Sequence, residues 1–468
     1  MLLFRKFSII LQPIIKGGLI VCNFTLHENQ RNLKSFNMRR ILFSAVVLAA
    51  CSTTALAQSG TNSPYSQFGL GAMTEQTSGF NRGMNGLGLG FHEHNQINFL
   101  NPASYSSLDS LSFIFDVGMS GQITNFEENG KKQNAKNGNL EYVVAGFRVL
   151  KHVGVSFGVV PFTNVGYNYS NSSFVGNSLS TSVTNTYSGS GGLHQVYLGT
   201  GWEPFKGFAF GANVSYLWGN ITRSVVNSYS DASVNTLSKY YAADVRSYRI
   251  DVGMQYTAQL SAKDAVTLGI TYGLGHKMKA DPSCTVVSKN LQTGVADSTV
   301  QTIRDGYELP TMIGAGLMYN HHNRLKIGLD YSLQKWAKID FPEYSVVNDQ
   351  PQYALKSGLL KDRHKFTFGG EFCPNEMGRG FAQRMHYRAG VSYATPYYKI
   401  NGTDGPKEIS ASLGFGIPII NTWNNRSMLN ISVQWARQSV TGFITENTFR
   451  LNVGLTFNER WFAKWKLN

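Results

Sequence analysis

Few residues of this chain have the types and spacing that catalysis or metal binding requires. His92, Glu93 and His94 could present imidazole and carboxylate ligands to zinc or iron, but the histidines stand two apart and no third ligand is near in the sequence. We interpret this stretch as a hydrated or packing segment. No Ser/His/Asp order stands out either. We therefore predict no enzyme, no catalytic residue, no bound metal and no cofactor.

Charged residues are more informative, because they recur at alternate positions within otherwise apolar segments. The set contains both signs: Asp116, Arg148, Arg249, Asp251, Lys326, Asp330, Lys365, Glu371, Arg388 and Arg450. A strand places alternate residues on opposite faces, so these charges are expected to share an inward face with many glycines. The structural interpretation is a network of ion pairs that holds strands and plug together. The functional alternative is a charged lumen that selects a solute.

The segments that carry these charges alternate strictly between apolar and polar residues. Leu429, Ile431, Val433 and Trp435, for example, are separated by polar or small residues. A period of two is typical of a strand with one apolar face. The segments with this pattern lie near 110–121, 140–149, 153–167, 194–203, 207–219, 245–258, 264–276, 309–320, 324–338, 363–373, 385–394, 406–418, 426–438 and 447–457.

These segments predict an all-β fold, a transmembrane antiparallel β-barrel of about 14 strands over residues 109–457. A sheet that spans a membrane must close on itself to leave no unpaired backbone. The outward faces are expected to be apolar, as in Val266, Leu268, Ile270 and Tyr272. Short and long links alternate along the first strands, so short turns are expected to face the periplasm and long loops the exterior.

The composition agrees with a barrel in the outer membrane of a Gram-negative cell. Only 15% of the 468 residues are charged, and no run of 18 apolar residues suggests a helical span. The net charge of +14 is not gathered in Lys/Arg-rich runs, so no nucleic acid is expected as a partner. A basic barrel can instead complement the anionic head groups of outer-membrane lipids and lipopolysaccharide.

The first 57 residues are predicted to be absent from the mature protein. Residues 38–57 combine a basic start, an apolar stretch and the small-x-small site Ala55-Leu56-Ala57, which predicts a signal peptide cleaved after Ala57. Residues 1–37 then form a mis-called upstream extension. A rival interpretation takes Leu48-Ala49-Ala50-Cys51 as a lipobox, with Cys51 lipidated.

Residues 58–108 differ from the strands that follow. They are rich in Gly, Asn, Ser and Phe and show little alternation, so we expect them to fill the lumen as an N-terminal plug. The tail, residues 458–468, mixes aromatic and basic residues and is expected in the periplasm. The topology places Cys284 and Cys373 at opposite ends of the barrel, so no disulfide is expected between them.

One proline interrupts the third predicted strand, in Gly158-Val159-Val160-Pro161-Phe162. Proline donates no ladder hydrogen bond and therefore belongs at strand edges or bulges. An ordinary barrel bulge would explain it. The functional alternative is a lateral opening near Gly158 and Pro161, through which an apolar molecule could leave the lumen for the bilayer.

With these features the chain resembles the FadL-type (OMPP1) family of outer-membrane hydrophobic-compound transporters. The resemblance rests on the Gly-rich N-terminal block, the motif Asn101-Pro102-Ala103 before the first strand, about fourteen strands, and the disruption at Pro161. It implies that residues 58–108 form a hatch, that Asn101, Pro102 and Ala103 belong to the end of that hatch, and that substrate leaves sideways at the kinked third strand.

Two features depart from that family. The long loops at 220–244 and 277–308 are mostly polar rather than apolar, and the basic aromatic tail continues past the last strand. The chain is also similar to PorV-like barrels, which implies a possible role in a secretion machine. We predict a barrel that passes hydrophobic small molecules such as long-chain fatty acids. The alternative is a non-transporting accessory or scaffold barrel of an outer-membrane secretion or assembly complex.

Overall fold

The alternating segments form strands that close into one ring. The computed structural model describes residues 60–175, 181–347, 350–419 and 427–459; the upstream extension, the signal peptide, Cys51 and most of the tail lie outside the described residues. The chain divides into residues 1–57 and 58–468, and all described residues belong to the second unit. The strands of the ring are β2 (Phe113–Glu128), β3 (Lys131–Leu150), β4 (Val153–Phe174), β5 (Ser182–Phe205), β6 (Phe208–Tyr229), β7 (Thr236–Gln259), β8 (Asp264–Gly273), β13 (Thr311–His321), β14 (Leu325–Lys335), β17 (Arg363–Phe372), β18 (His386–Ala394), β21 (Lys407–Ile419), β22 (Ser427–Ser439) and β23 (Thr445–Glu459).

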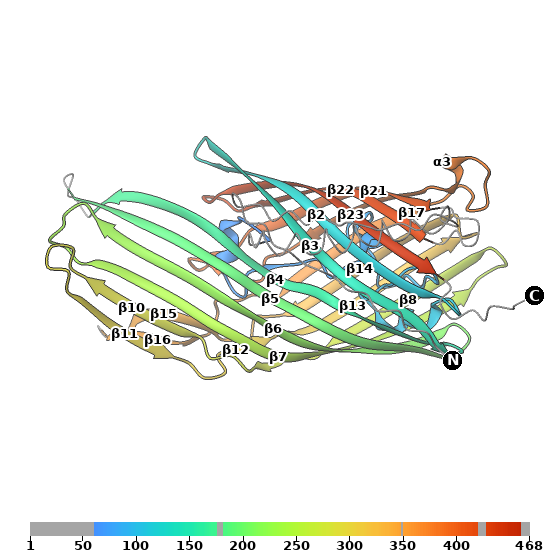
Figure 1. Cartoon of the computed structure of the whole chain (residues 1–468), viewed down its shortest axis with the longest axis horizontal. Helices are drawn as coiled ribbons and strands as arrows, with labels where there is room; N and C mark the ends of the chain where they lie inside the picture. Colours follow the sequence, from blue (N-terminus) through green and yellow to red (C-terminus); the bar gives the residue numbers. More distant parts are fainter. Residues whose placement is uncertain (1–59, 176–180, 348–349, 420–426, 460–468) are drawn as a thin grey trace, which may run out of the picture. The chain divides into compact units, whose positions relative to one another are not determined.

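Each of these fourteen strands pairs antiparallel with the next, and β23 pairs with β2 to close the barrel (Figure 1). Every predicted strand is found, so the predicted fold class is confirmed. Where the ring is closed, no strand edge is left free. The backbone N–H and C=O groups can then pair within the sheet, as a medium without water requires. Among the described residues, no helix is both long and apolar enough to cross a membrane.

The alternation sorts side chains to the two faces as predicted. Leu268, Ile270 and Tyr272 of β8 are 43%, 38% and 44% exposed, and similar apolar side chains cover the outside of the other strands. Polar partners at intervening positions are buried, such as Thr267 on the same strand. An apolar exterior over a polar interior is the pattern of outer-membrane barrels.

The barrel wall has two heights. Strands β4 to β7 have 22 to 24 residues each, whereas β13, β14, β17 and β18 have 9 to 11. About ten tilted residues suffice to span a bilayer, so the tall wall continues well beyond the membrane on the side of the long loops. That wall is widened by β10 (Ser283–Lys289), which pairs with β7, and by β11 (Ala296–Thr302). Burial in β10 raises the pKa of the Cys284 thiol.

The long loops add three small two-stranded sheets near the same end. These are β9 (His276–Met278) with β12 (Tyr307–Leu309), β15 (Phe341–Val347) with β16 (Gln350–Lys356), and β19 (Lys399–Ile400) with β20 (Thr403–Asp404). The opposite end carries short turns and one longer connection with α3 (Phe381–Arg384). Cys373 follows β17 at that end, away from Cys284 as predicted.

Residues 60–112 pack against the inner wall of the barrel. They contain η2 (Pro64–Gln67), β1 (Ala72–Met73), α2 (Gly79–Arg82) and η3 (Pro102–Ser107). Inward glycines of the strands make room for them: a Cβ on Gly211 would lie 2.5 Å from the Pro102 carbonyl, and one on Gly390 would lie 2.3 Å from the Met84 carbonyl oxygen. The inward face therefore needs small residues, because larger side chains would overlap the N-terminal segment.

Candidate functional site: the β3–β4 seam and the cavity beside it

The barrel wall is split between β3 and β4. Their hydrogen-bonded ladder starts beside the short turn that joins these two strands and stops at the pair Val143–Val159. Beyond it, residues 131–142 of β3 pair only with β2, and residues 160–174 of β4 pair on the other side with β5. The two strands diverge toward the tall end in Figure 1. We name this divergence the seam.

Proline explains where the seam begins. The register of β4 with β5 shifts between Pro161 and Thr163, so the strand bulges at the residue that has no N–H to donate. Gly158 lies just before this point, where a Cβ would sit 2.5 Å from the Val143 carbonyl oxygen. The disruption predicted at Pro161 is present as a bulge.

The N-terminal segment occupies the seam on the side of β4. Strand β1 pairs antiparallel with it, Ala72 opposite Asn164 and Met73 opposite Thr163. The Thr74 N–H donates to the Phe162 carbonyl at 3.2 Å. The side chains of Thr74 and Gln76 each donate to the Pro161 carbonyl at 2.6 Å.

The same segment also touches β3. The Asn139 side chain donates to the Gly60 carbonyl at 2.9 Å, and a Cβ on Gly60 would meet Asn164 of β4 at 2.7 Å. Gly60 therefore lies between the two diverging strands. The segment fills the split with two paired residues and several side-chain contacts, where a complete barrel would have a full ladder.

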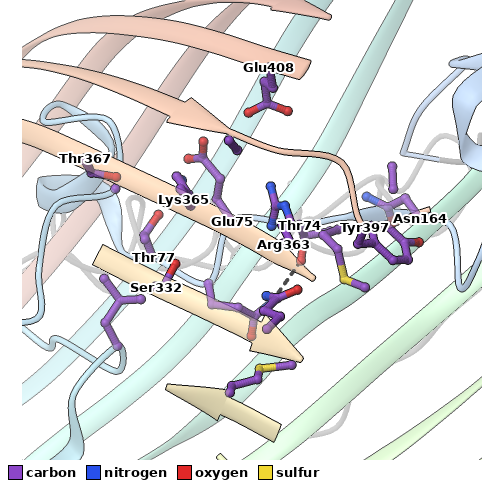
Figure 2. Close-up of a pocket in the computed structure, with 18 of the residues that line it drawn as sticks. Thr74, Glu75, Thr77, Asn164, Ser332, Arg363, Lys365, Thr367, Tyr397 and Glu408 are labelled. Carbon is purple, nitrogen blue, oxygen red and sulfur yellow. Dashed lines mark hydrogen bonds between the residues drawn. The ribbon is translucent and has the colours of Figure 1, made fainter. Parts of the chain in front are cut away.

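A cavity of about 340 Å³ lies beside the seam and is lined by the N-terminal segment and by strands from around the ring. Its lining includes the charged residues Glu75, Arg363, Lys365 and Glu408 (Figure 2). It also includes apolar residues such as Met73. Because charged and apolar side chains share the lining, a molecule with one polar end and one apolar end would match it.

The predicted lumen charges face inward, and several pair with one another. Arg388 Nε donates to Glu371 at 2.6 Å, Lys326 Nζ lies 3.5 Å from Glu371, and Arg249 binds Asp251 at 2.9 Å. Two others hold the N-terminal segment: Asp330 accepts from the Gly88 and Leu89 N–H groups, and Arg148 contacts the Ser106 carbonyl at 3.4 Å. Of the remaining three, Asp116 and Arg450 have neutral partners, Tyr142 and Gln122, and Lys365 lines the cavity.

A buried ion pair within this network was not anticipated. Arg82 of α2 donates to Glu141 of β3 at 3.0 Å, and both side chains are under 10% exposed. Arg82 also donates to the backbone carbonyls of Glu75 and Thr77 at 3.2 Å. It thus ties the stretch after β1 to the seam. In the sequence, only the position of Arg82 within the Gly-rich block, residues 58–108, could have indicated this role.

The motif Asn101-Pro102-Ala103 starts η3 at the short-turn end. Asn101 caps this helix by accepting from the Ala103 N–H at 3.2 Å, and its amide donates to the carbonyls of Leu89 and Met254. Pro102 is the first residue of η3, where its missing N–H costs nothing. The motif thus anchors the end of the segment to β7.

The metal candidates have other partners. His92 binds Gln255 at 2.7 Å, Glu93 binds Lys326 at 2.6 Å, and His94 binds Asp109 at 3.0 Å. Within the described ranges no three His, Cys, Asp or Glu side chains are grouped to hold a metal ion. His321 binds Asp264 in the short turns.

One serine has the spacing of a nucleophile elbow, in Gly154-Val155-Ser156-Phe157-Gly158. An elbow needs a sharp turn between a strand and a helix. Ser156 instead lies inside β4, fully buried, where its hydroxyl donates to the Ala145 carbonyl at 3.0 Å and contacts the Tyr197 hydroxyl at 2.9 Å. Its role is structural.

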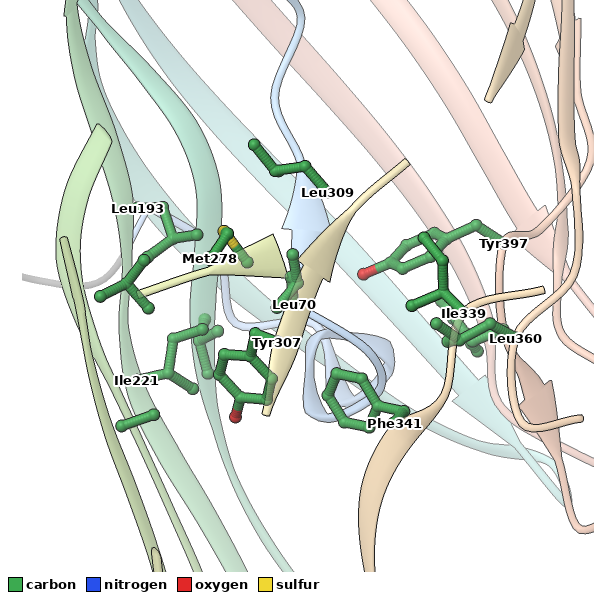
Figure 3. Packing of buried hydrophobic residues seen from close by; sticks show 14 of the residues in the cluster. Leu70, Leu193, Ile221, Met278, Tyr307, Leu309, Ile339, Phe341, Leu360 and Tyr397 are labelled. Carbon is green, nitrogen blue, oxygen red and sulfur yellow. The ribbon is translucent and has the colours of Figure 1, made fainter. Parts of the chain in front are cut away.

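Hydrophobic clusters lie on both sides of the cavity. Toward the long loops, Leu70 and Tyr65 pack with residues of the tall wall and of the loops, among them Tyr307, Phe341 and Tyr397 (Figure 3). Toward the short turns, the segment packs against β2, β3, β4 and β5 through the cluster of Ile97, Phe99, Tyr105, Leu108, Ile114, Tyr142, Val144, Val160 and Tyr197.

Together these features define the class: an outer-membrane-type β-barrel of fourteen strands, with an N-terminal segment against its inner wall and a seam beside its third strand. The model of the BamG family matches residues 38–468, so the chain belongs to this family. Among curated proteins, none matches the chain.

Solved structures share the fold. The toluene transporter TodX of Pseudomonas putida superimposes with a TM-score of 0.58 at 14% identity, covering 83% of this chain and 100% of TodX. A FadL homologue of Pseudomonas aeruginosa gives 0.57 at 13% identity, covering 82% and 99%. The CymD monoaromatic hydrocarbon channel gives 0.55 at 15% identity, covering 83% and 98%. The chain thus shares the β-barrel fold of these channels and transporters.

Proposed function

We propose that this barrel passes hydrophobic small molecules that carry one polar end, such as long-chain fatty acids, and releases them sideways through the seam. The observation that carries the proposal is the split of β3 from β4 beyond Val143 and Val159, covered by only two residues of β1. Residues 58–108 act as the hatch in this scheme. Movement of β1 away from β4 opens a path from the cavity to the bilayer.

The lining of the cavity supports this class of substrate. Lys365 and Arg363 can face a carboxylate, while Met73, Leu89 and Met312 can face an alkyl chain. The named functions of the similar structures, toluene transport and a channel for monoaromatic hydrocarbons, concern hydrophobic compounds.

A disulfide across β1 and β4 tests the route. Cysteines at Met73 and Thr163, which lie opposite each other, should bond because paired strands bring Cα atoms within disulfide range. In a background without the native cysteines, we expect the oxidised M73C/T163C variant to reduce passage of a fluorescent fatty acid into vesicles to the protein-free level. Reduction should restore it.

A second disulfide is the matched control. Thr257 and Thr267 face each other across β7 and β8, far from the seam in the ladder order. Oxidised T257C/T267C should therefore leave passage unchanged. If the M73C/T163C bond forms fully and passage continues at the original rate, release through the seam is wrong.

A second candidate is an accessory barrel of a secretion or assembly complex. The packed clusters on both sides of the cavity and the buried Arg82–Glu141 pair favour it, because they fix the N-terminal segment to the barrel wall. We expect purification in mild detergent to separate the candidates. A stoichiometric complex that fails to pass fatty acid favours the accessory role, and a monomer with bound lipid favours transport.

A further inference from the structure

We propose that the connection between β17 and β18, residues 373–385, anchors the barrel in the phospholipid head groups on the side of the short turns. The turns after β3, β5, β7 and β13 at this end have two to four residues each. The connection after β17 is longer and carries α3, which Figure 1 shows at the short-turn end of the barrel. Its contact with lipid is independent of whether the barrel transports or belongs to a complex.

The connection exposes two large apolar side chains. Met377 is 91% exposed and Phe381 is 56% exposed, although neither belongs to a strand that faces the bilayer. Both gain free energy when they leave water, by about 25 cal/mol for each Å² of apolar surface. At the end of a barrel that spans a membrane, the adjacent head-group region offers such an environment.

Hydrogen bonds give the connection a fixed backbone conformation. The Asn375 N–H donates to the Gln383 carbonyl at 2.8 Å, and the Asn375 carbonyl accepts from the Gly378 N–H at 3.0 Å. The side chain of Asn375 accepts from the Met377 N–H at 3.1 Å. An ordered segment therefore presents Met377, so its exposure does not reflect a chain without structure.

The connection is continuous with the lipid-facing surface of the barrel. Phe372, Tyr387 and Phe415 lie opposite one another on β17, β18 and β21, on the outward face of the sheet. The Tyr387 hydroxyl donates to the Ala382 carbonyl of α3 at 3.1 Å. Because Tyr387 faces outward, this bond places the backbone next to Phe381 at the rim of the surface that meets lipid.

The charges of the connection favour phosphate groups as the polar part of its partner. Arg379 lies between Met377 and Phe381 in the sequence, is exposed, and forms no ion pair with any described residue. Arg384 ends α3, and Glu376 is the one acidic residue of the connection. A guanidinium group binds phosphate through paired N–H groups. Apolar side chains next to such cations are typical of segments that lie in a membrane interface.

An environment-sensitive dye on single cysteines tests the anchor. The variants Met377→Cys and Phe381→Cys, in a chain that also carries Cys284→Ser and Cys373→Ser, are labelled and placed in vesicles of phosphatidylethanolamine and phosphatidylglycerol. We expect the dye to emit at shorter wavelength than in water and to lose emission when the phospholipid carries a nitroxide high on its acyl chain. Phe368→Cys, on the lipid-facing side of β17, is the positive control.

Lys263→Cys is the matched negative control. Lys263 is exposed in the turn after β7 at the same end of the barrel, beside the polar Ser261 and Asp264. The dye there should emit as in water and keep its emission when the nitroxide lipid is present. Water-like emission at Met377 or Phe381, or equal loss of emission at Lys263, would overturn the anchor. Shielding of residues 373–385 that requires a complex purified from native membrane would also overturn it and indicate a protein partner.

A change of charge tests the contact with phosphate. We expect Arg379→Glu to reduce the loss of emission from a dye at Phe381→Cys, because phosphatidylglycerol repels the new carboxylate. Glu376→Gln, in the same connection, should leave that loss unchanged or increase it. If Arg379→Glu has no effect, the assignment of Arg379 to the head groups is wrong.

Discussion

Replacing Glu371 by glutamine is expected to destabilise the barrel by about 3 kcal/mol, as for other buried charges that lose their partner. Glu371 is the common ion-pair partner of Arg388, Lys326 and His386, at 2.6, 3.5 and 3.1 Å. Glutamine has nearly the same shape, so packing is kept and the charge is lost. Arg388, only 2% exposed, would then keep a neutral partner, Asn430, and no carboxylate.

Unfolding in urea from lipid vesicles measures this change. The control is Asp404→Asn, which removes the acceptor of Lys361 in an exposed pair with side chains 46% and 40% exposed. Exposed pairs contribute little, so the control should change stability by less than about 1 kcal/mol. Equal stability of the two variants would show that the interior charges do not hold the strands together.

The strands could be predicted within the membrane and not beyond it. Where one face meets lipid, alternation is strict, and the expected segments match β8 or β21 within a few residues. Beyond the membrane the outer face meets water instead of lipid, so residues 182–193 of β5 and 220–229 of β6 lack an apolar outer face, although Leu193 and Ile221 are buried on the inner one. Hydroxyl pairs such as Ser188–Ser224, 2.7 Å apart, join these extensions. Segments that were expected to be loops are therefore strands of the tall wall.

The inward charges could be predicted by position but not by partner. Alternation assigns Asp330 and Lys326 to the inner face. It cannot indicate that Asp330 accepts from the Gly88 N–H, more than 200 residues away in sequence, or that Glu93 binds Lys326. Pro161 likewise predicts a disruption of its strand. Ala72 and Met73, the two residues of β1, have nothing in their types or spacing that predicts a strand covering this disruption.

The N-terminal segment packs closely against the barrel wall at Gly269. Gly269→Val should displace residues 88–90 from β8, because a Cβ at Gly269 would lie 1.9 Å from the Leu89 carbonyl oxygen. The obstacle is backbone that is already fixed by Asp330 and Gln255, so no flexible side chain can yield. We expect a loss of about 3 kcal/mol, the upper part of the range for overpacking.

Displacement should also open the lumen to ions if the segment is a plug. We therefore expect a raised ion conductance of Gly269→Val in planar bilayers, together with its lower resistance to urea. Gly121→Val of β2 is the matched control, because nothing lies within 4 Å of a Cβ there and valine suits a strand. Its conductance and stability should equal those of the unmodified barrel. If Gly269→Val is less stable but still closed to ions, the segment supports the wall without sealing it, and the hatch assigned to residues 58–108 would have to be abandoned.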